Sequence, residues 1–173
     1  KFPENNNFQK QEVDILIKME KLDEAIEELK IAISNEPENV TLLTNLGMLY
    51  DFNEDSENAI KYYKEALAID PSSRNALINL AVLYITSGDA INKSAIDMDI
   101  KTYNKEGAAV EAKAKEEWNE AVPLLMKVLE ADEKDELALQ NLQAVYSKLR
   151  DVDNAQKYYD LRKEYGYVVE EDN

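Results

Sequence analysis

The sequence predicts an all-α protein made of about four stacked helix pairs, and three observations support this prediction. The chain has 173 residues, of which 45% are hydrophobic, enough to bury a core. It contains only four Gly and four Pro among many Ala, Leu, Glu and Lys, which favour helices. Residues also recur 34 positions apart. A period of this length is typical of repeated helix pairs.

Composition excludes several kinds of partner and chemistry. Asp and Glu outnumber Lys and Arg by 36 to 20, which gives a formal net charge of −16. Because this charge repels phosphate groups, we expect no nucleic-acid partner. The chain has no Cys and no His, which removes disulfides and imidazole metal ligands. No apolar run reaches the roughly 18 residues of a membrane span, so we expect no membrane insertion.

The repeat is clearest over residues 40–73, where small residues mark the predicted helix contact. Gly47 and Ala59 allow two antiparallel helices to approach closely, and Tyr50 and Tyr63 fill the space beside them. The packing face is marked by Leu43, Leu46 and Tyr50 on the first helix and by Ala59, Tyr63 and Ala66 on the second. The positions that recur are Pro3/Pro37/Pro71, Ala25/Ala59, Ala32/Ala66, Leu43/Leu77, Leu46/Leu80 and Tyr50/Tyr84.

These signature residues resemble the tetratricopeptide-repeat (TPR) consensus. The resemblance implies a right-handed superhelix that binds proteins or peptides, with no enzymatic activity and no cofactor. The repeats are expected at about 6–39, 40–73, 74–135 and 136–166, followed by an acidic tail over 167–173.

The first and last repeats depart from the pattern. The first has a predicted second helix over 23–34, but Gln9 and Glu12 stand where the later repeats have Leu. Pro3 stands where a preceding helix would end, so we expect a further repeat upstream of Lys1. In the last repeat the small residue is replaced by Gln143, and Arg162 replaces Ala66. Arg162 would polarise the surface that a following repeat covers.

The third repeat contains an insertion. Gly88 to Ala121 spans 33 positions, against 5 from Glu54 to Ala59, an excess of 28 residues near 89–120. This stretch is rich in Ala, Lys and Glu and predicts a protruding helical hairpin that turns near 103–107. Pro123 predicts a kink in the returning helix.

A long third repeat before a single closing repeat is similar to a group of bacterial, often exported, TPR proteins. This similarity favours an exported or periplasmic location and leaves the cytoplasm open.

The TPR resemblance places a partner in a concave groove lined by the first helices. Asn45, Asn79 and Asn141 form a predicted ladder of amides that can donate to and accept from a peptide backbone. Bonding to a neighbouring helix is an equally good interpretation of these residues. The predicted groove residues are Thr41, Thr44, Asn45, Met48, Asn75, Ile78, Asn79, Val82, Gln140 and Asn141.

Three other kinds of site are not supported. A pocket for a terminal carboxylate would match Lys10 and Asn45, but it lacks cations at Asn75 and Asn79 and has Asp14 in place of Asn. The segments 97–99 and 151–153 begin like calcium loops but lack the required Gly, which indicates helix-end or surface carboxylates. Adjacent acids such as Glu116 and Glu117 point to different helix faces, so they predict no catalytic pair.

The sequence thus leaves two functions open. In the first, the groove holds a peptide or protein segment. In the alternative, the hairpin around Tyr103 and Trp118 pairs with a second copy or docks on another subunit.

Overall fold

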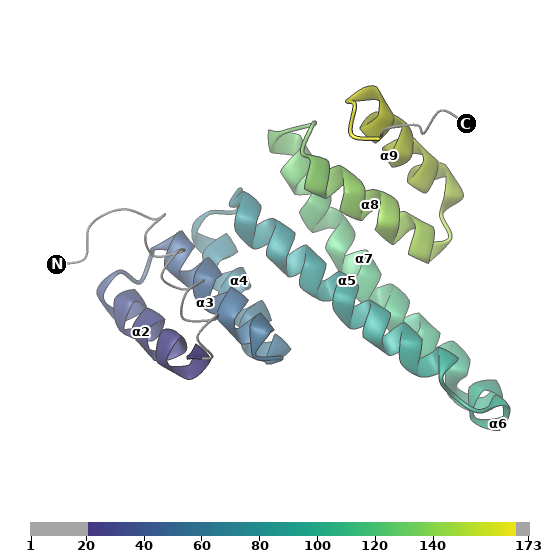
Figure 1. Cartoon of the computed structure of the whole chain (residues 1–173), viewed down its shortest axis with the longest axis horizontal. Helices are drawn as coiled ribbons and strands as arrows, with labels where there is room; N and C mark the ends of the chain where they lie inside the picture. Colours follow the sequence, from purple (N-terminus) through teal and green to yellow (C-terminus); the bar gives the residue numbers. More distant parts are fainter. Residues whose placement is uncertain (1–20, 169–173) are drawn as a thin grey trace. The chain divides into compact units, whose positions relative to one another are not determined.

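The computed structural model describes residues 21–168, and in this range it consists of helices joined by turns, with no strand (Figure 1). The all-α prediction is therefore confirmed for this part of the chain. The expected first helix of the first repeat, with Pro3, Gln9, Lys10, Glu12 and Asp14, lies outside the described residues, as does most of the acidic tail. The helices are α2 (Leu22–Asn35), α3 (Val40–Phe52), α4 (Ser56–Ile69), α5 (Arg74–Ile96), α6 (Ile100–Thr102), the π-helix η1 (Tyr103–Gly107), α7 (Ala108–Ala131), α8 (Glu136–Leu149) and α9 (Val152–Glu164).

The chain divides into two compact units, and the division falls between Asn79 and Leu80, inside α5. The first unit contains α2, α3, α4 and the start of α5. The second contains the remainder of α5 and all later helices. The single solenoid over 1–173 and its four repeat ranges stay predictions.

Short polar side chains in the turns cap the N-termini of several helices. Each capping oxygen accepts hydrogen bonds from backbone N–H groups that have no partner inside the helix. Asp99 and Asp151 do this at α6 and α9, which confirms that the acids of 97–99 and 151–153 belong to helix ends. The caps are Asn39 for α3, Asp55 for α4, Asp99 for α6, Asp135 for α8 and Asp151 for α9.

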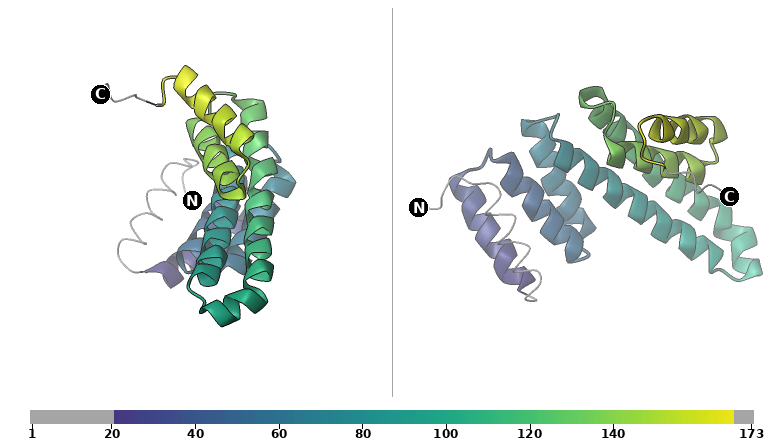
Figure 2. Two further views of the ribbon diagram at one scale, coloured as in Figure 1. Left: turned by 90° about the vertical axis from the view of Figure 1, so that its right-hand side faces the viewer. Right: turned by 45° about the horizontal axis from the view of Figure 1, so that its top comes forward.

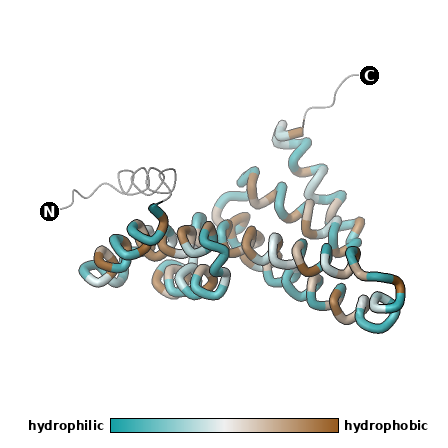
Figure 3. Tube along the Cα trace, turned by 60° about the horizontal axis from the view of Figure 1, so that its bottom comes forward, coloured by the Kyte–Doolittle hydropathy of each residue, from teal (hydrophilic) through white to brown (hydrophobic). Residues whose placement is uncertain are grey.

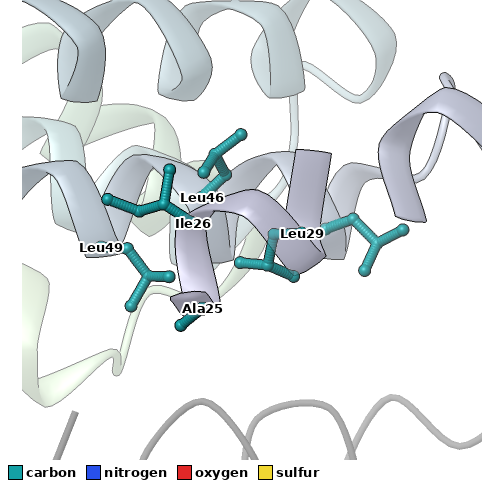
Figure 4. Packing of buried hydrophobic residues seen from close by; sticks show 6 residues of the cluster. Ala25, Ile26, Leu29, Leu46 and Leu49 are labelled. Atoms are coloured by element: carbon teal, nitrogen blue, oxygen red, sulfur yellow. The ribbon is translucent and has the colours of Figure 1, made fainter. Parts of the chain in front are cut away.

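In the first unit, α2 packs on α3 through aliphatic side chains (Figure 4). Ala25, Ile26 and Leu29 form the buried face of α2, and Leu46 and Leu49 oppose them from α3. These residues follow the helical period, so each helix buries one face. Figure 3 shows the same alternation of hydrophobic and hydrophilic residues along the described helices.

The contact between α3 and α4 depends on Gly47. A Cβ at this position would lie 2.8 Å from two ring carbons of Tyr63 and 3.3 Å from the carbonyl oxygen of Ala59. Tyr63 is fully buried, so its ring has little room to move away. The predicted close approach is confirmed. Tyr50 fills a different space, because its ring stacks on that of Tyr62 with centroids 5.5 Å apart.

In the second unit, the later part of α5 lies beside α7 (Figure 2). A Cβ on Gly88 would lie 2.5 Å from Nε1 of Trp118, so only Gly leaves room for the indole. Farther along the chain α7 packs on α8, and α8 packs on α9. Tyr146 stacks on Tyr158 with centroids 5.7 Å apart, which repeats the Tyr50–Tyr62 stack of the first unit.

The helical backbone does not break at residues 103–107, near which the turn is predicted. The helical backbone breaks earlier, at residues 97–99, and residues 103–107 form the π-helix η1 that continues into α7. Asp99 caps the new helix, which explains the position of the break. Gly107 is buried against the ring of Tyr103, whose hydroxyl donates to Glu111.

Farther on, α7 continues through Pro123 without ending, and the predicted kink there stays a prediction.

Replacing Gly47 with Ala should destabilise the protein by about 1–3 kcal/mol, because the new methyl group must displace the buried Tyr63 ring. Inside an uncrowded helix the same change stabilises by about 0.5–1 kcal/mol, so the sign of the effect is diagnostic. Urea unfolding followed by circular dichroism measures it. The exposed Ala68→Gly in α4 calibrates helix propensity alone, and a more stable Gly47→Ala protein would contradict the packing described.

The capping carboxylates should make stability sensitive to acid. Hydrogen bonds from Asn58 and Asn154 lower the pKa values of Asp55 and Asp151 in the folded state. This stabilisation is complete above the unfolded-state pKa and is lost as the pH falls through the lower folded-state pKa, below about pH 4. The doubly substituted protein Asp55→Asn, Asp151→Asn should therefore lose less of its urea midpoint between about pH 4 and 2 than the wild type. Asp153→Asn, which caps no helix, should follow the wild type, and identical acid profiles for all three proteins would refute this account.

Candidate functional site

Seven of the ten predicted groove residues lie in the first unit, on α3 and the start of α5. Leu43 of α3, Ala66 of α4 and Ala76 of α5 form one buried cluster, which holds the three helices together there. The predicted groove residues of this unit include no charged side chain. They offer Asn amides, two Thr hydroxyls and apolar groups. They are Thr41, Thr44, Asn45, Met48, Asn75, Ile78 and Asn79.

Burial differs sharply among these residues. Thr44 is 5% exposed, and its hydroxyl donates to the carbonyl of Val40 one turn earlier, so it is satisfied within α3. Ile78 is also buried, whereas Asn75 is exposed. Met48 is half-buried and packs against the cluster between α2 and α3. Thr44 and Ile78 therefore support the structure more than they face an open surface.

Asn45 is the unusual residue of the site. It is 7% exposed, and its Nδ2 is buried without a hydrogen-bond partner. Thr41 and Met48 lie about one turn away on α3, and both are half-buried. An unpaired buried amide costs about 1–3 kcal/mol, so most such groups in proteins find a partner. Asn45 retains free hydrogen-bonding capacity at a position where α3 is partly accessible.

The amide ladder is not uniform. Asn79 is half-buried beside Tyr63, whose hydroxyl is buried without a hydrogen bond of good geometry. Burial raises the pKa of Tyr63, the charge of Asp51 adds to this, and the Asn79 side chain opposes it as the smallest of the three effects. Asn141 of the second unit instead donates to the carbonyl of Leu137 in its own helix. Of these three amides, Asn45 is the one with a buried nitrogen that has no hydrogen-bond partner.

The other second-unit groove residues, Val82 and Gln140, are half-buried and exposed respectively. Both belong to the second unit, so a groove through all ten residues stays a prediction.

Sequence reasoning missed a polar cluster in the second unit. Asp89 accepts a hydrogen bond of 3.1 Å from Nε1 of Trp118 and forms an ion pair of 2.8 Å with Nζ of Lys148. The same Nζ lies 5.8 Å from the centroid of the Trp118 ring. The three residues come from α5, α7 and α8. Trp118 and Lys148 lie 29 and 59 positions after Asp89 in the sequence. No local sequence pattern predicts such a contact. It links three helices and therefore has a structural role.

The described part of the chain, residues 21–168, contains no group of three or more acidic side chains arranged to hold a metal ion. None of its helices is both long and apolar enough to cross a membrane.

Comparison with known proteins identifies the repeat. Residues 40–73, which form α3, α4 and their flanking turns, match the family model of the tetratricopeptide repeat. These residues form a tetratricopeptide repeat. A TPR fold suggests a scaffold for protein interaction or assembly, and such repeats are generally non-enzymatic. A search of curated proteins found no match.

Solved TPR structures resemble this protein at low identity. A TPR protein from Parabacteroides merdae is 22% identical with a TM-score of 0.42, covering 92% of this chain and 66% of that one. The TPR protein TTC0263 from Thermus thermophilus is 16% identical with a TM-score of 0.42, covering 94% and 98%. MamA protein is 19% identical with a TM-score of 0.42, covering 96% and 98%. Similarities at this level carry no conclusion about partner or activity.

Removing the central carboxylate by Asp89→Ala should lower the free energy of unfolding by about 1 kcal/mol, because the Trp118 N–H loses its acceptor and Lys148 its counter-ion. Trp118 is the single tryptophan, so its fluorescence reports both unfolding and the local change. We expect a shifted emission maximum in the folded state. Asp97→Ala, at the end of α5, is the matched control, and an Asp89→Ala protein with unchanged stability and emission would show that the cluster has no structural role.

Proposed function

We propose that this TPR protein is a scaffold that binds an extended segment of a partner protein across α3 and the start of α5. The observation that carries the proposal is the unpaired amide of Asn45, 7% exposed on the first helix of the best-formed repeat. A peptide carbonyl is the natural acceptor for such a donor. The bound segment would meet its backbone partner there without any requirement for a particular side chain.

The surroundings of Asn45 support a backbone ligand. Thr41 and Met48 lie on either side along α3, and Asn75 presents an exposed amide at the start of α5. Because none of these residues is charged, recognition rests on hydrogen bonds and apolar contact, with no fixed ion pair. A neutral site in a protein of net charge −16 favours neutral or basic segments, since acidic ones are repelled at long range.

The self-association alternative has its own support. Ile96, Ile100 and Tyr103 lie at or near the break between α5 and α7 and are 71%, 82% and 42% exposed. Exposed aliphatic residues close together are uncommon on a surface that stays free. We therefore keep docking through this tip as the second candidate function.

Asn45→Ala should weaken binding of an extended peptide about fivefold while leaving stability nearly unchanged, because the amide makes no hydrogen bond to lose. The probe is a peptide selected from a random-sequence phage library against the wild-type protein, and fluorescence anisotropy measures its Kd. Asn53→Ala, at the exposed C-terminus of α3, is the matched control and should bind like the wild type. If no peptide can be selected, or if binding survives in both Asn45→Ala and Asn79→Ala, the proposal fails.

For the second candidate, the doubly substituted protein Ile96→Asp, Ile100→Asp should be monomeric if the tip mediates self-association, because charged side chains cannot enter an apolar contact without losing hydration. Light scattering compares its mass with that of the wild type. A wild-type protein that is already monomeric, or an unchanged oligomer in the substituted protein, would remove this candidate.

A further inference from the structure

A depression of about 370 Å³ lies between the C-terminal half of α8 and the N-terminal half of α9. Its lining includes Gln143, Arg150 and Tyr159, together with the apolar Val152 and Ala155. None of the lining residues is Asp or Glu, although acids outnumber bases by 36 to 20 in the chain. The depression therefore differs in charge from the rest of the protein.

The repeat explains why this surface is suited to a helix. Its residues Gln143, Ala155 and Tyr159 occupy the repeat positions of Gly47, Ala59 and Tyr63 in the first unit. There, the equivalent surface is closed by the start of α5, since Ala76 shares a buried cluster with α3 and α4 and Asn79 lies beside Tyr63. Within residues 21–168, no helix covers the later copy, and Val152 at its edge is 74% exposed. A helix of another chain fits the place that α5 takes in the first unit.

Gln143 also changes the shape of the surface. In the first unit the Tyr63 ring lies directly against Gly47 and is fully buried. A glutamine in the same place fills that space, and Tyr159 remains half-buried at the rim of the depression. The hydroxyl of Tyr159 is thus available to a ligand, whereas that of Tyr63 is not.

The depression has one cationic lining residue, Arg150. Arg150 is exposed and holds the left-handed position after α8, with φ 61°, where Glu54 stands in the first unit with φ 58°. The charge at this position is reversed between the two copies. The charge of Arg150 acts on the hydroxyl of Tyr103, which donates a hydrogen bond to Glu111.

Arg162 is hydrogen-bonded to Gln143, one of the lining residues of the depression. Its guanidinium donates a hydrogen bond of 2.6 Å to Oε1 of Gln143, and its Nε is buried without a partner. Because Oε1 of Gln143 accepts from Arg162, the amide group of Gln143 is left to donate. The acids Asp153 and Asp160 line a neighbouring depression that shares Gln156 with this one, and Asp160 accepts a hydrogen bond from Gln156.

We infer that this depression binds an acidic helix of a partner protein, with a Glu or Asp carboxylate of that helix paired to Arg150. The Gln143 amide and the Tyr159 hydroxyl supply further donors to the carboxylate, and Val152 and Ala155 contact the apolar side of the helix. A carboxylate and a guanidinium form charge-assisted hydrogen bonds in a fork geometry that fixes orientation. The site is separate from the Asn45 surface, so either can fail without the other.

The test uses the intact protein and a phage-displayed library of helical peptides randomised on one face. Selection against the wild type, with counter-selection against Arg150→Asn, should yield peptides enriched in Glu or Asp. Asn tolerates the left-handed conformation, so this substitution removes the cation without straining the turn. Kd values measured by anisotropy should rise about tenfold in Arg150→Asn and in a peptide whose acids are changed to Gln.

Lys113→Asn, which removes an exposed cation of α7 outside the depression, is the matched control and should bind like the wild type. Three outcomes would overturn the inference: selected peptides that are neutral or basic, equal binding to wild type and Arg150→Asn, or self-association of the protein that depends on Arg150. The last outcome would assign the surface to a second copy of this chain.

Discussion

The structure depends on close approach of paired helices where a glycine faces an aromatic ring. In the first unit this contact joins α3 to α4 through Gly47 and the buried Tyr63. In the second it joins α5 to α7 through Gly88 and Trp118. Because a single helix pair buries little apolar surface, such contacts have to recur for the stack to be stable. They also hold the exposed faces of the first helices in place, and a binding surface requires this rigidity.

The two units keep the same backbone plan but use its surfaces differently. The Tyr50–Tyr62 stack of the first unit recurs as Tyr146–Tyr158 in the second, so the geometry of the pair is conserved between them. At the face next to it, Gly47 becomes Gln143, and a closed apolar contact becomes an open polar depression. The predicted groove residues of the first unit carry no charge, whereas the depression of the second unit has Arg150 in its lining. Side chains at equivalent positions, and not the fold, distinguish the partners that we propose.

Much of the fold was predictable because helical periodicity reports which face of each helix is buried. The small-residue contact at Gly47 and the role of the acids at 97–99 as helix-end groups follow from local patterns of this kind. The position of the helix break does not, since the residues at 103–107 suggest a turn but form a π-helix, and Asp99 caps the helix that follows the break. The Asp89–Trp118 contact was equally invisible, because it joins residues 29 positions apart. At the site, the sequence does not distinguish Asn45 from Asn141. The structure does, because the Nδ2 of Asn45 is buried without a hydrogen-bond partner, whereas Asn141 donates to a carbonyl of its own helix.

Hydrogen exchange of backbone amides, followed with and without a selected extended peptide, tests most directly whether the first unit is the binding scaffold. Exchange reports local opening, so a ligand that orders a surface slows it there. The account predicts slower exchange in α3 and at the start of α5, with α9 unaffected. Protection confined to α8 and α9, or protection nowhere despite saturating peptide, would contradict it.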